Sequence, residues 1–312
     1  MTAMDDLTHA LAGTLMARTH PSKKRGLALA CVFGSLIPDI DIVLTLWGRD
    51  FYVTEHRGFT HSLWGLLPMS FLAAGAAWLW VRKKEDGASF PLLWFMAGLG
   101  VVSHILLDWC TSWGTMIFWP NRTRFSLDHL FIIDLWYMAI LALPIAFSFY
   151  RKEYRVRICV AGIACTLAYH ALVAFNHQKA VALVGEGHPG AWTAAFPQPF
   201  SPFRWSAYER EKGLLRNARI DFLKSAEPLE WNEWQEPLRT AAVQAAMDSP
   251  RGRDFLWFAR VPMWREEAQA DGSTAVYFWD LRFNGYGRSG QESHRFGERF
   301  IVKDGKVTQG GF

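Results

Sequence analysis

Six long apolar runs occupy the first part of the chain, over residues 7–17, 26–47, 63–81, 90–109, 131–150 and 158–175. Most are about 18–22 residues long, the length that a helix needs to cross a hydrocarbon core about 30 Å thick. The first run is too short to span comfortably, so we expect it to lie tilted against the others. Pro38 interrupts the second run, and we expect the helix to kink or end there because proline cannot continue the hydrogen-bond ladder.

The pattern changes after residue 177, where charges and proline become frequent and no long apolar run recurs. Prolines at positions 189, 197, 199 and 202 predict an ordered but irregular linker over residues 178–203. Residues 204–211 and 214–223 flank Lys212-Gly213 and predict a hairpin. Residues 254–261 and 274–283 alternate apolar and polar positions as strands do, and residues 237–247 predict a helix.

These patterns predict the fold class. We expect a polytopic α-helical membrane domain of about six hydrophobic helices over residues 1–177, followed by a small α+β domain over residues 204–312. Clusters of Lys and Arg fall within residues 18–25, 82–84 and 151–157, which are alternate connections between the runs. Basic loops favour the cytoplasmic side. The chain is therefore predicted to be a multi-pass inner (cytoplasmic) membrane protein whose C-terminal domain is extracytoplasmic.

Composition narrows the classes of partner. The net charge of +4 is small for a protein of 312 residues, and no basic stripe with interleaved aromatics occurs, so no nucleic acid is expected as a partner. Membrane lipids are expected as partners, because the apolar runs would be surrounded by them. The cysteines lie in or beside apolar runs and are interpreted as small packing residues, rather than as a disulfide or zinc-thiolate framework: Cys31, Cys110, Cys159 and Cys165.

Ionisable residues recur in these runs at what the predicted topology makes the outer side. His104 and Asp108 stand four apart, so on a helix they share one face and could bind one cation. Ionisable groups at membrane depth are costly unless they are paired or functional. Imidazole and carboxylate ligands suit Zn²⁺, with Mn²⁺ or Fe²⁺ as alternatives, and the ligands suffice for one or two ions. The candidate metal ligands are His9, Asp39, Asp41, His56, His61, His104, Asp108 and Asp134.

Several short motifs carry a resemblance to a known family. They are Thr8-His9-Ala-Leu-Ala-Gly13, Pro38-Asp39-Ile-Asp41, His56-Arg57-Gly58-Phe-Thr60-His61-Ser62, His104-x3-Asp108 with Gly114-Thr115, and a later segment with Asp128 and Asp134. Together they resemble the YdjM/YbcI-like inner-membrane metal-dependent hydrolases over residues 4–140. The order of ligands is also distantly similar to zinc-dependent phospholipase C and the P1-type nucleases, although their full later His-x3-Glu element is missing. The resemblance implies metal chemistry more firmly than a substrate.

The sequence therefore favours metal-dependent hydrolysis of a phosphoester or other ester, of a small molecule or a lipid. Asp39 and Asp41 are candidate catalytic residues, one bridging metals and one orienting a histidine, and Arg57 is the candidate clamp for a phosphate. The competing interpretation is a non-catalytic metal-binding membrane protein, either an envelope scaffold or a metal carrier.

Simpler roles remain open for single residues. His9 could lie at the lipid headgroups, Asp134 could pair with a helix start, and Arg57 could pair with Glu55 or Asp50. Asp128 and His129 could form a solvated loop edge, and structural roles are favoured for His170 and His177.

Overall fold

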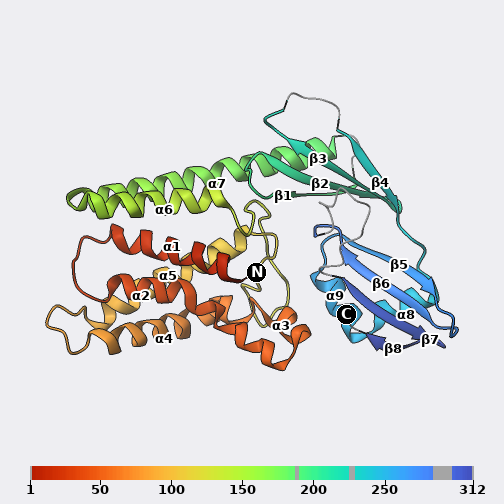
Figure 1. Cartoon of the computed structure of the whole chain (residues 1–312), viewed down its shortest axis with the longest axis horizontal. Coiled ribbons are helices and arrows are strands. Elements are labelled where there is room, and N and C mark those ends of the chain that lie inside the picture. Colours follow the sequence, from red (N-terminus) through yellow and green to blue (C-terminus); the bar gives the residue numbers. More distant parts are fainter. Residues whose placement is uncertain (1, 187–189, 225–228, 284–296, 311–312) are drawn as a thin grey trace.

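The computed structural model describes residues 2–186, 190–224, 229–283 and 297–310. A helical bundle forms the first part of the chain and two β-sheets form the last part (Figure 1). The helices of the bundle are α1 (Thr2–Thr19), α2 (Leu27–Leu36), α3 (Arg49–Glu55), α4 (Leu63–Val81), α5 (Phe90–Cys110), α6 (Leu135–Tyr150) and α7 (Arg155–Gly185). Short 3₁₀ helices cover Ile37–Trp47, Phe59–His61 and Lys152–Tyr154.

Four helical segments of the described chain are long and apolar enough to cross a membrane: Leu27–Trp47, Leu63–Val81, Phe90–Cys110 and Lys152–Gly185. Helix α6 is apolar but shorter, with 16 residues, and α1 is not among the candidate spans. Large apolar side chains of α4, α6 and α7 are exposed, as they are in helices that face lipid. Of the about six hydrophobic helices predicted, the structure thus supports four as membrane spans.

The break predicted at Pro38 is confirmed. Helix α2 ends at Leu36, and the chain continues as a 3₁₀ helix in which Pro38 occupies the first turn. Proline is tolerated there because the first amides of a helix have no partner within it. The change of helix type matters for function because the 3₁₀ segment carries Asp39 and Asp41.

Small residues bring α2 and α5 into close contact. A Cβ atom added at Gly34 would lie 2.1 Å from the carbonyl oxygen of Ala97, and one added at Gly100 would lie 2.2 Å from that of Cys31. Only glycine fits such an approach, a common device of membrane helix pairs. It places the end of α2 directly against the part of α5 that carries His104.

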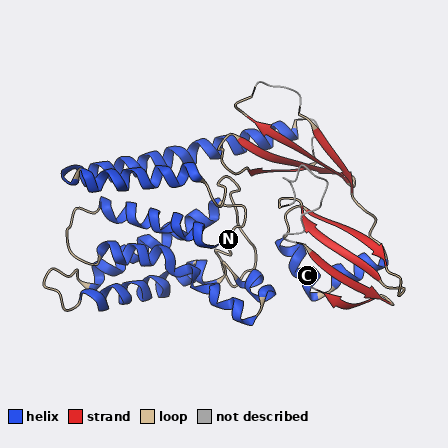
Figure 2. Cartoon of the chain, in the orientation of Figure 1, coloured by secondary structure: helices blue, strands red, loops and turns tan. Residues whose placement is uncertain are grey.

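The C-terminal part contains two four-stranded antiparallel sheets and two helices (Figure 2). The first sheet has the order β1 (Trp192–Pro197), β2 (Arg204–Glu211), β3 (Leu214–Asp221) and β4 (Trp231–Gln235). The second has the order β5 (Pro262–Ala268), β6 (Thr274–Asp280), β7 (Glu298–Lys303) and β8 (Lys306–Gly310). The helices are α8 (Ala241–Asp248) and α9 (Pro250–Phe258). The predicted hairpin is confirmed, because Glu211 pairs with Leu214.

Two predictions for this part were wrong. Residues 254–261 were expected to form a strand, but most of them belong to α9, whose start is capped by the Ser249 hydroxyl accepting from the Gly252 amide. The irregular linker expected over residues 178–203 instead contributes the end of α7 and strand β1, which pairs with β2 along its whole length. Six residues separate the end of α7 from β1, and three of them, including Pro189 of the predicted linker, lie outside the described residues.

Arginines of α9 and of the connections before β5 and after β6 dock this part onto the bundle. Arg260 donates to the Asp128 carboxylate at 2.9 Å, Arg282 donates to the Ser112 carbonyl at 2.7 Å, and Arg251 donates to Asp50 at 2.9 Å. The contacts lie at the end of the bundle where the 3₁₀ segment and α3 are also found (Figure 1).

Candidate metal centre

Four of the predicted ligands meet in one place. Asp39 of the 3₁₀ helix, His61, and His104 and Asp108 of α5 each offer an atom, and these atoms all lie within 4.8 Å of one another. His61, His104 and Asp108 are buried, whereas Asp39 is partly exposed. The i, i+4 pair shares one face as predicted, with His104 Nε2 3.3 Å from Asp108 Oδ2. These four residues are called the four-residue centre below.

The two imidazoles face each other through the same nitrogen. His61 Nε2 and His104 Nε2 are 3.0 Å apart. His61 Nε2 is also 3.1 Å from Asp108 Oδ2 and 3.3 Å from Asp39 Oδ1. The separation between His104 Nε2 and Asp39 Oδ1 is 3.6 Å. Two ring nitrogens and two carboxylate oxygens therefore surround one point.

Hydrogen bonds on the far side of each ring fix which nitrogen carries the proton. His104 Nδ1 is 2.8 Å from the Ser35 carbonyl oxygen, which can only accept, so Nδ1 must donate. The Thr60 hydroxyl donates to Asp41 and lies 2.9 Å from His61 Nδ1, from which it accepts. In the neutral form, both Nε2 atoms then present lone pairs to each other and to two carboxylates. Four acceptors that face one another need a cation between them.

The separations also suit a metal ion. A tetrahedral ion with ligands at about 2.0–2.1 Å holds them about 3.3–3.4 Å apart. Five of the six separations between ligand atoms of the four-residue centre run from 3.0 to 3.6 Å. The outer hydrogen bonds to Ser35 and Thr60 are the kind that orients metal-binding histidines.

The demand for positive charge also appears in the acid–base behaviour of His61. Burial lowers the pKa of an imidazole, but hydrogen bonds to Asp108 and Asp39 outweigh that effect and raise the pKa of His61. Without another cation, the carboxylates would hold a proton on this ring.

A second group lies beside the four-residue centre and shares Asp39 with it. Asp39, Asp41 and His56 also offer ligand atoms within 4.8 Å of one another. His56 Nδ1 is 2.9 Å from Asp41 Oδ1. Burial lowers the pKa of His56, although the bond to Asp41 acts in the opposite direction, so the ring is neutral near pH 7. Asp41 thus orients His56 while its other oxygen accepts from the Arg57 amide.

His9 of α1 completes the wall of the centre. Its ring stacks on that of His104 with centroids 3.7 Å apart, and its Nε2 lies 3.3 Å from Asp108 Oδ1. The structure thus brings His9 to the cluster, in contact with two ligands.

Arg57 is buried in a different role from the one predicted. Its backbone has a positive φ of 60°, which turns the side chain inward. Its Nη2 is 2.8 Å from Asp108 Oδ1, and its Nη1 donates to the Thr111 hydroxyl at 3.0 Å. The side chain is only 2% exposed. The structure therefore places this guanidinium on Asp108, behind the ligand, rather than on the side from which a phosphate would enter.

Asp134 does not join the four-residue centre or the group of Asp39, Asp41 and His56. Its carboxylate caps α6 by accepting from the Trp136 and Tyr137 amides, and it also accepts from the Tyr169 hydroxyl at 2.7 Å. Asp134 therefore has the alternative role considered from the sequence, in which it pairs with the start of a helix. Its prediction as a metal ligand finds no support in the geometry.

Comparisons with known proteins agree with this picture of the first part of the chain. The sequence profile described as "YdjM inner membrane protein" matches residues 4–180, more than half of the chain. The chain belongs to the YdjM inner membrane protein family. The match covers most of α1, all of α2 to α6 and most of α7, and therefore the whole four-residue centre.

Individual relatives cover less. The Bacillus subtilis (strain 168) uncharacterized protein YfhP is 28% identical over 156 residues, 43% of this chain and 46% of that protein. The inner membrane proteins YdjM of Escherichia coli (strain K12) and Shigella flexneri are each 31% identical over 112 residues, 32% of this chain and 53% of theirs. The chain thus spans about half the length of the curated relatives it matches. No solved structure matches.

The structure of this YdjM family member also reveals a residue that sequence reasoning missed. Arg124, in the loop after α5, lines an open cavity of about 610 Å³ together with Trp113, Arg122, Trp257 and Arg260. Its Nη2 donates to the His56 carbonyl at 2.8 Å, while its Nε and Nη1 have no hydrogen-bond partner among the described residues. Burial lowers the pKa of Arg124 to about 9, so it remains a cation at neutral pH. No motif in the sequence distinguishes Arg124 from other arginines in loops.

Proposed function

We propose that this protein is a membrane-bound, metal-dependent hydrolase that acts on a phosphoester, with lipid-derived phosphoesters as the favoured substrate class. One observation carries the proposal: two imidazole nitrogens and two carboxylate oxygens converge with lone pairs facing one another. Asp39, His61, His104 and Asp108 would hold one divalent ion, Zn²⁺ in the first place. A bound divalent ion of this kind supplies Lewis acidity toward the ester and lowers the pKa of water.

The residues around the centre have separable roles. His56, neutral and held by Asp41, can accept a proton from water at Nε2 and return it to the leaving group, as paired histidines do in general acid–base catalysis. Arg57 holds Asp108 and is a positioning residue. Asp39 is the most exposed of the ligands, so we place the substrate on its side of the centre.

The cavity beside the centre supports a phosphoester over a neutral ester. Arg122, Arg124 and Arg260 line it, and Nε and Nη1 of the Arg124 guanidinium are buried without a hydrogen-bond partner among the described residues. Trp113 connects the two places, because it lines the cavity and its ring lies 6.0 Å from that of His56. A planar guanidinium matches two phosphate oxygens, and the contact strengthens as negative charge grows in the transition state.

The arrangement of charges supports an extracytoplasmic centre. The three basic connections, α1–α2, α4–α5 and α6–α7, lie at the end of the bundle away from the sheets (Figure 1). Basic connections favour the cytoplasm. The four-residue centre and the C-terminal sheets, at the other end, would then lie outside, near the headgroups of the outer leaflet.

The test compares metal content and hydrolysis in matched variants of the full-length protein. His104→Ala should release about one ion per chain and lower phosphodiester hydrolysis at least a hundred-fold, because it removes one ligand from a shared ion. Arg124→Lys should keep the metal but lower kcat/KM for a phosphodiester about ten- to a hundred-fold, or about 1.4–2.7 kcal/mol. A carboxylic ester should be affected much less. His20→Ala, outside the centre on the basic α1–α2 connection, is the control.

The outcomes separate the proposed class from its competitor. Wild-type protein that binds metal but hydrolyses neither phosphodiesters nor phospholipids would favour a non-catalytic metal-binding protein. If the His20→Ala control loses metal as His104→Ala does, the result would contradict the placement of the ion in the four-residue centre.

A further inference from the structure

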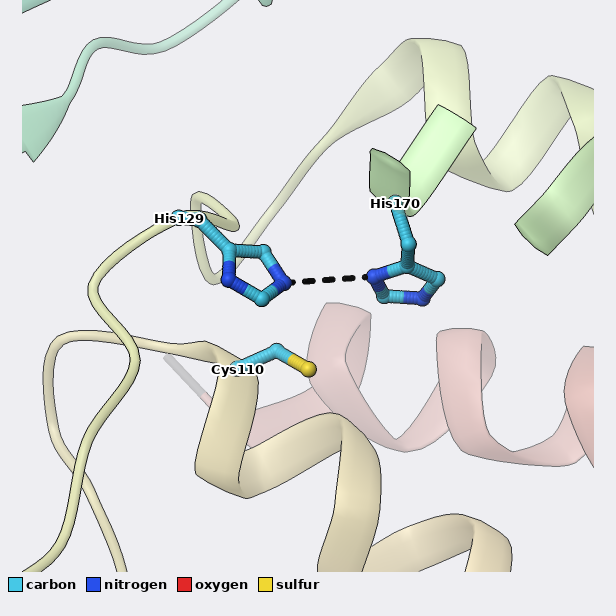
Figure 3. A group of neighbouring side chains, drawn as sticks. All are labelled: Cys110, His129 and His170. Atoms are coloured by element: carbon cyan, nitrogen blue, oxygen red, sulfur yellow. Dashed lines mark hydrogen bonds between the residues drawn. The ribbon is translucent and has the colours of Figure 1, made fainter. Parts of the chain in front are cut away.

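A second cluster of ligand types lies apart from the four-residue centre. Cys110 at the end of α5, His129 in the following loop and His170 of α7 offer a sulfur and two nitrogens within 4.8 Å of one another. Figure 3 shows the three side chains converging from three separate segments. His129 Nε2 and His170 Nδ1 are 3.4 Å apart, the separation that a shared tetrahedral ion with bonds of about 2.0–2.1 Å imposes on two imidazoles.

The backbone fixes the first two ligands together. The His129 amide donates to the Cys110 carbonyl at 3.1 Å, and the Leu130 amide donates to the same oxygen at 3.0 Å. Asp128, just before His129, is held by Arg260 at 2.9 Å. The loop therefore cannot carry His129 away from Cys110 without breaking contacts on both sides.

The third ligand is oriented from behind. His170 Nε2 lies 3.1 Å from the hydroxyl of Tyr137, a buried residue of α6. A proton on Nε2 that is donated to this hydroxyl leaves Nδ1 as the lone pair that faces His129. Outer hydrogen bonds of this kind fix the tautomer of metal-binding histidines.

The ligand atoms of the cluster can become available to a metal. The Cys110 thiol must give up its proton for the sulfur to bind, and the two imidazoles bind in their neutral form. The cysteines of the described chain are free, so the Cys110 sulfur is not consumed by a disulfide.

We propose that Cys110, His129 and His170 form a second metal site that binds one thiophilic ion, Zn²⁺ or Cu⁺. One thiolate and two imidazoles favour these ions over Mg²⁺, Ca²⁺ or Mn²⁺, which prefer oxygen. Binding replaces the thiol proton by the metal, and the proton is released to solvent. The ion would join the end of α5 to α7, the helix that continues into the C-terminal sheets.

Cobalt distinguishes this site from the four-residue centre. A thiolate bound to Co²⁺ gives an intense charge-transfer band in the near ultraviolet, and the four-residue centre contains no sulfur. Full-length His104→Ala protein in detergent, titrated with Co²⁺, should develop this band and saturate at about one ion per chain. Adding Cys110→Ser or His170→Gln to that variant should abolish or shift the band, whereas adding Cys165→Ser, which alters an exposed cysteine of the same α7, should leave it unchanged.

A second measurement guards against variants that fold poorly. Zn²⁺ should raise the unfolding temperature of His104→Ala and of His104→Ala/Cys165→Ser, but not that of His104→Ala/Cys110→Ser. A charge-transfer band that survives Cys110→Ser, or the absence of any band in His104→Ala, would overturn the proposal. Either failure would leave the hydrolase proposal standing, because that proposal depends on phosphodiester turnover and on metal lost with His104.

Discussion

Arg57 shows how one side chain can support a candidate metal centre without being one of its ligands. Its guanidinium and the Asp108 carboxylate are 2% and 1% exposed, so this is an ion pair removed from water. Asp108 Oδ1 takes this contact, which leaves Oδ2 directed at His61 and His104. A buried pair is costly to break because the remaining charge is left uncompensated.

We therefore expect Arg57→Ala to lower the free energy of unfolding by about 3–5 kcal/mol, the usual effect of removing one partner from a buried pair. Chemical unfolding in detergent, followed by tryptophan fluorescence, measures the change. Bound divalent metal should offset part of the loss because it supplies the missing positive charge. Arg122→Ala is the matched control, since Arg122 is exposed and about 3.8 Å from its Glu55 partner. Equal stability of the two variants would contradict the supporting role of Arg57.

Several of these residues could be found from the sequence, and the reason is physical. His104 and Asp108 lie within one helix, where a spacing of four residues fixes their relative geometry. Pro38 predicts a break in the preceding helix, and Asp39 and Asp41 follow directly after it. The partner of Arg57 could not be found, because a positive φ in a short turn decides where that side chain points. Cys110, His129 and His170 meet only through the packing of separate segments.

Helices α2 and α5 form the scaffold that aligns the ligands. The contact of Ser35 with His104 depends on how closely the two helices approach, and Gly34 and Gly100 permit that approach. At this level sequence reasoning located most helices and the hairpin but not α9. Its signals, a serine cap followed by proline in the first turn, were present at Ser249 and Pro250.

Gly100→Ala should force α2 and α5 apart, because its Cβ would meet the Cys31 carbonyl. We expect a loss of about 1–3 kcal/mol of stability, typical of overpacking. Weaker binding of metal should accompany it, because the His104 ring would lose its alignment. Gly98→Ala, on the same helix, is the control, since its Cβ would meet only the Ser70 Cβ at 4.0 Å. That variant should be neutral or stabilised by up to about 1 kcal/mol. Metal affinity and thermal unfolding, measured on both proteins, check the expectation.

In the whole molecule, the basic connections and the candidate metal centre lie at opposite ends of the helical bundle. The basic connections lie at one end of the bundle and the sheets at the other (Figure 1). The four-residue centre belongs to the end with the sheets, because α5 starts at the basic α4–α5 connection and carries His104 and Asp108 in its last turns. The arginine-lined cavity includes Trp257, Phe258 and Arg260 and so lies against the C-terminal part. Docking of the sheets by Arg251, Arg260 and Arg282 means that these features share one side of the membrane.

A topology reporter tests that side. A reporter that is active only in the cytoplasm, fused to the C-terminus, should be silent, whereas one fused within the α4–α5 connection should be active. The second fusion controls for expression and insertion. Activity of the C-terminal fusion would reverse the orientation, and the centre would then face cytoplasmic substrates.

Helix α7 has one more property, which follows from its length alone. Its 31 residues extend about 46 Å at 1.5 Å per residue, more than a hydrocarbon core of about 30 Å, and β1 is the next element along the chain. A long helix answers a thinner bilayer by tilting, and the far end of a stiff rod moves the most. The thickness of the surrounding lipid would thereby act as a mechanical input, transmitted along α7 to β1, where the Phe196 ring packs against Arg260 at the edge of the cavity.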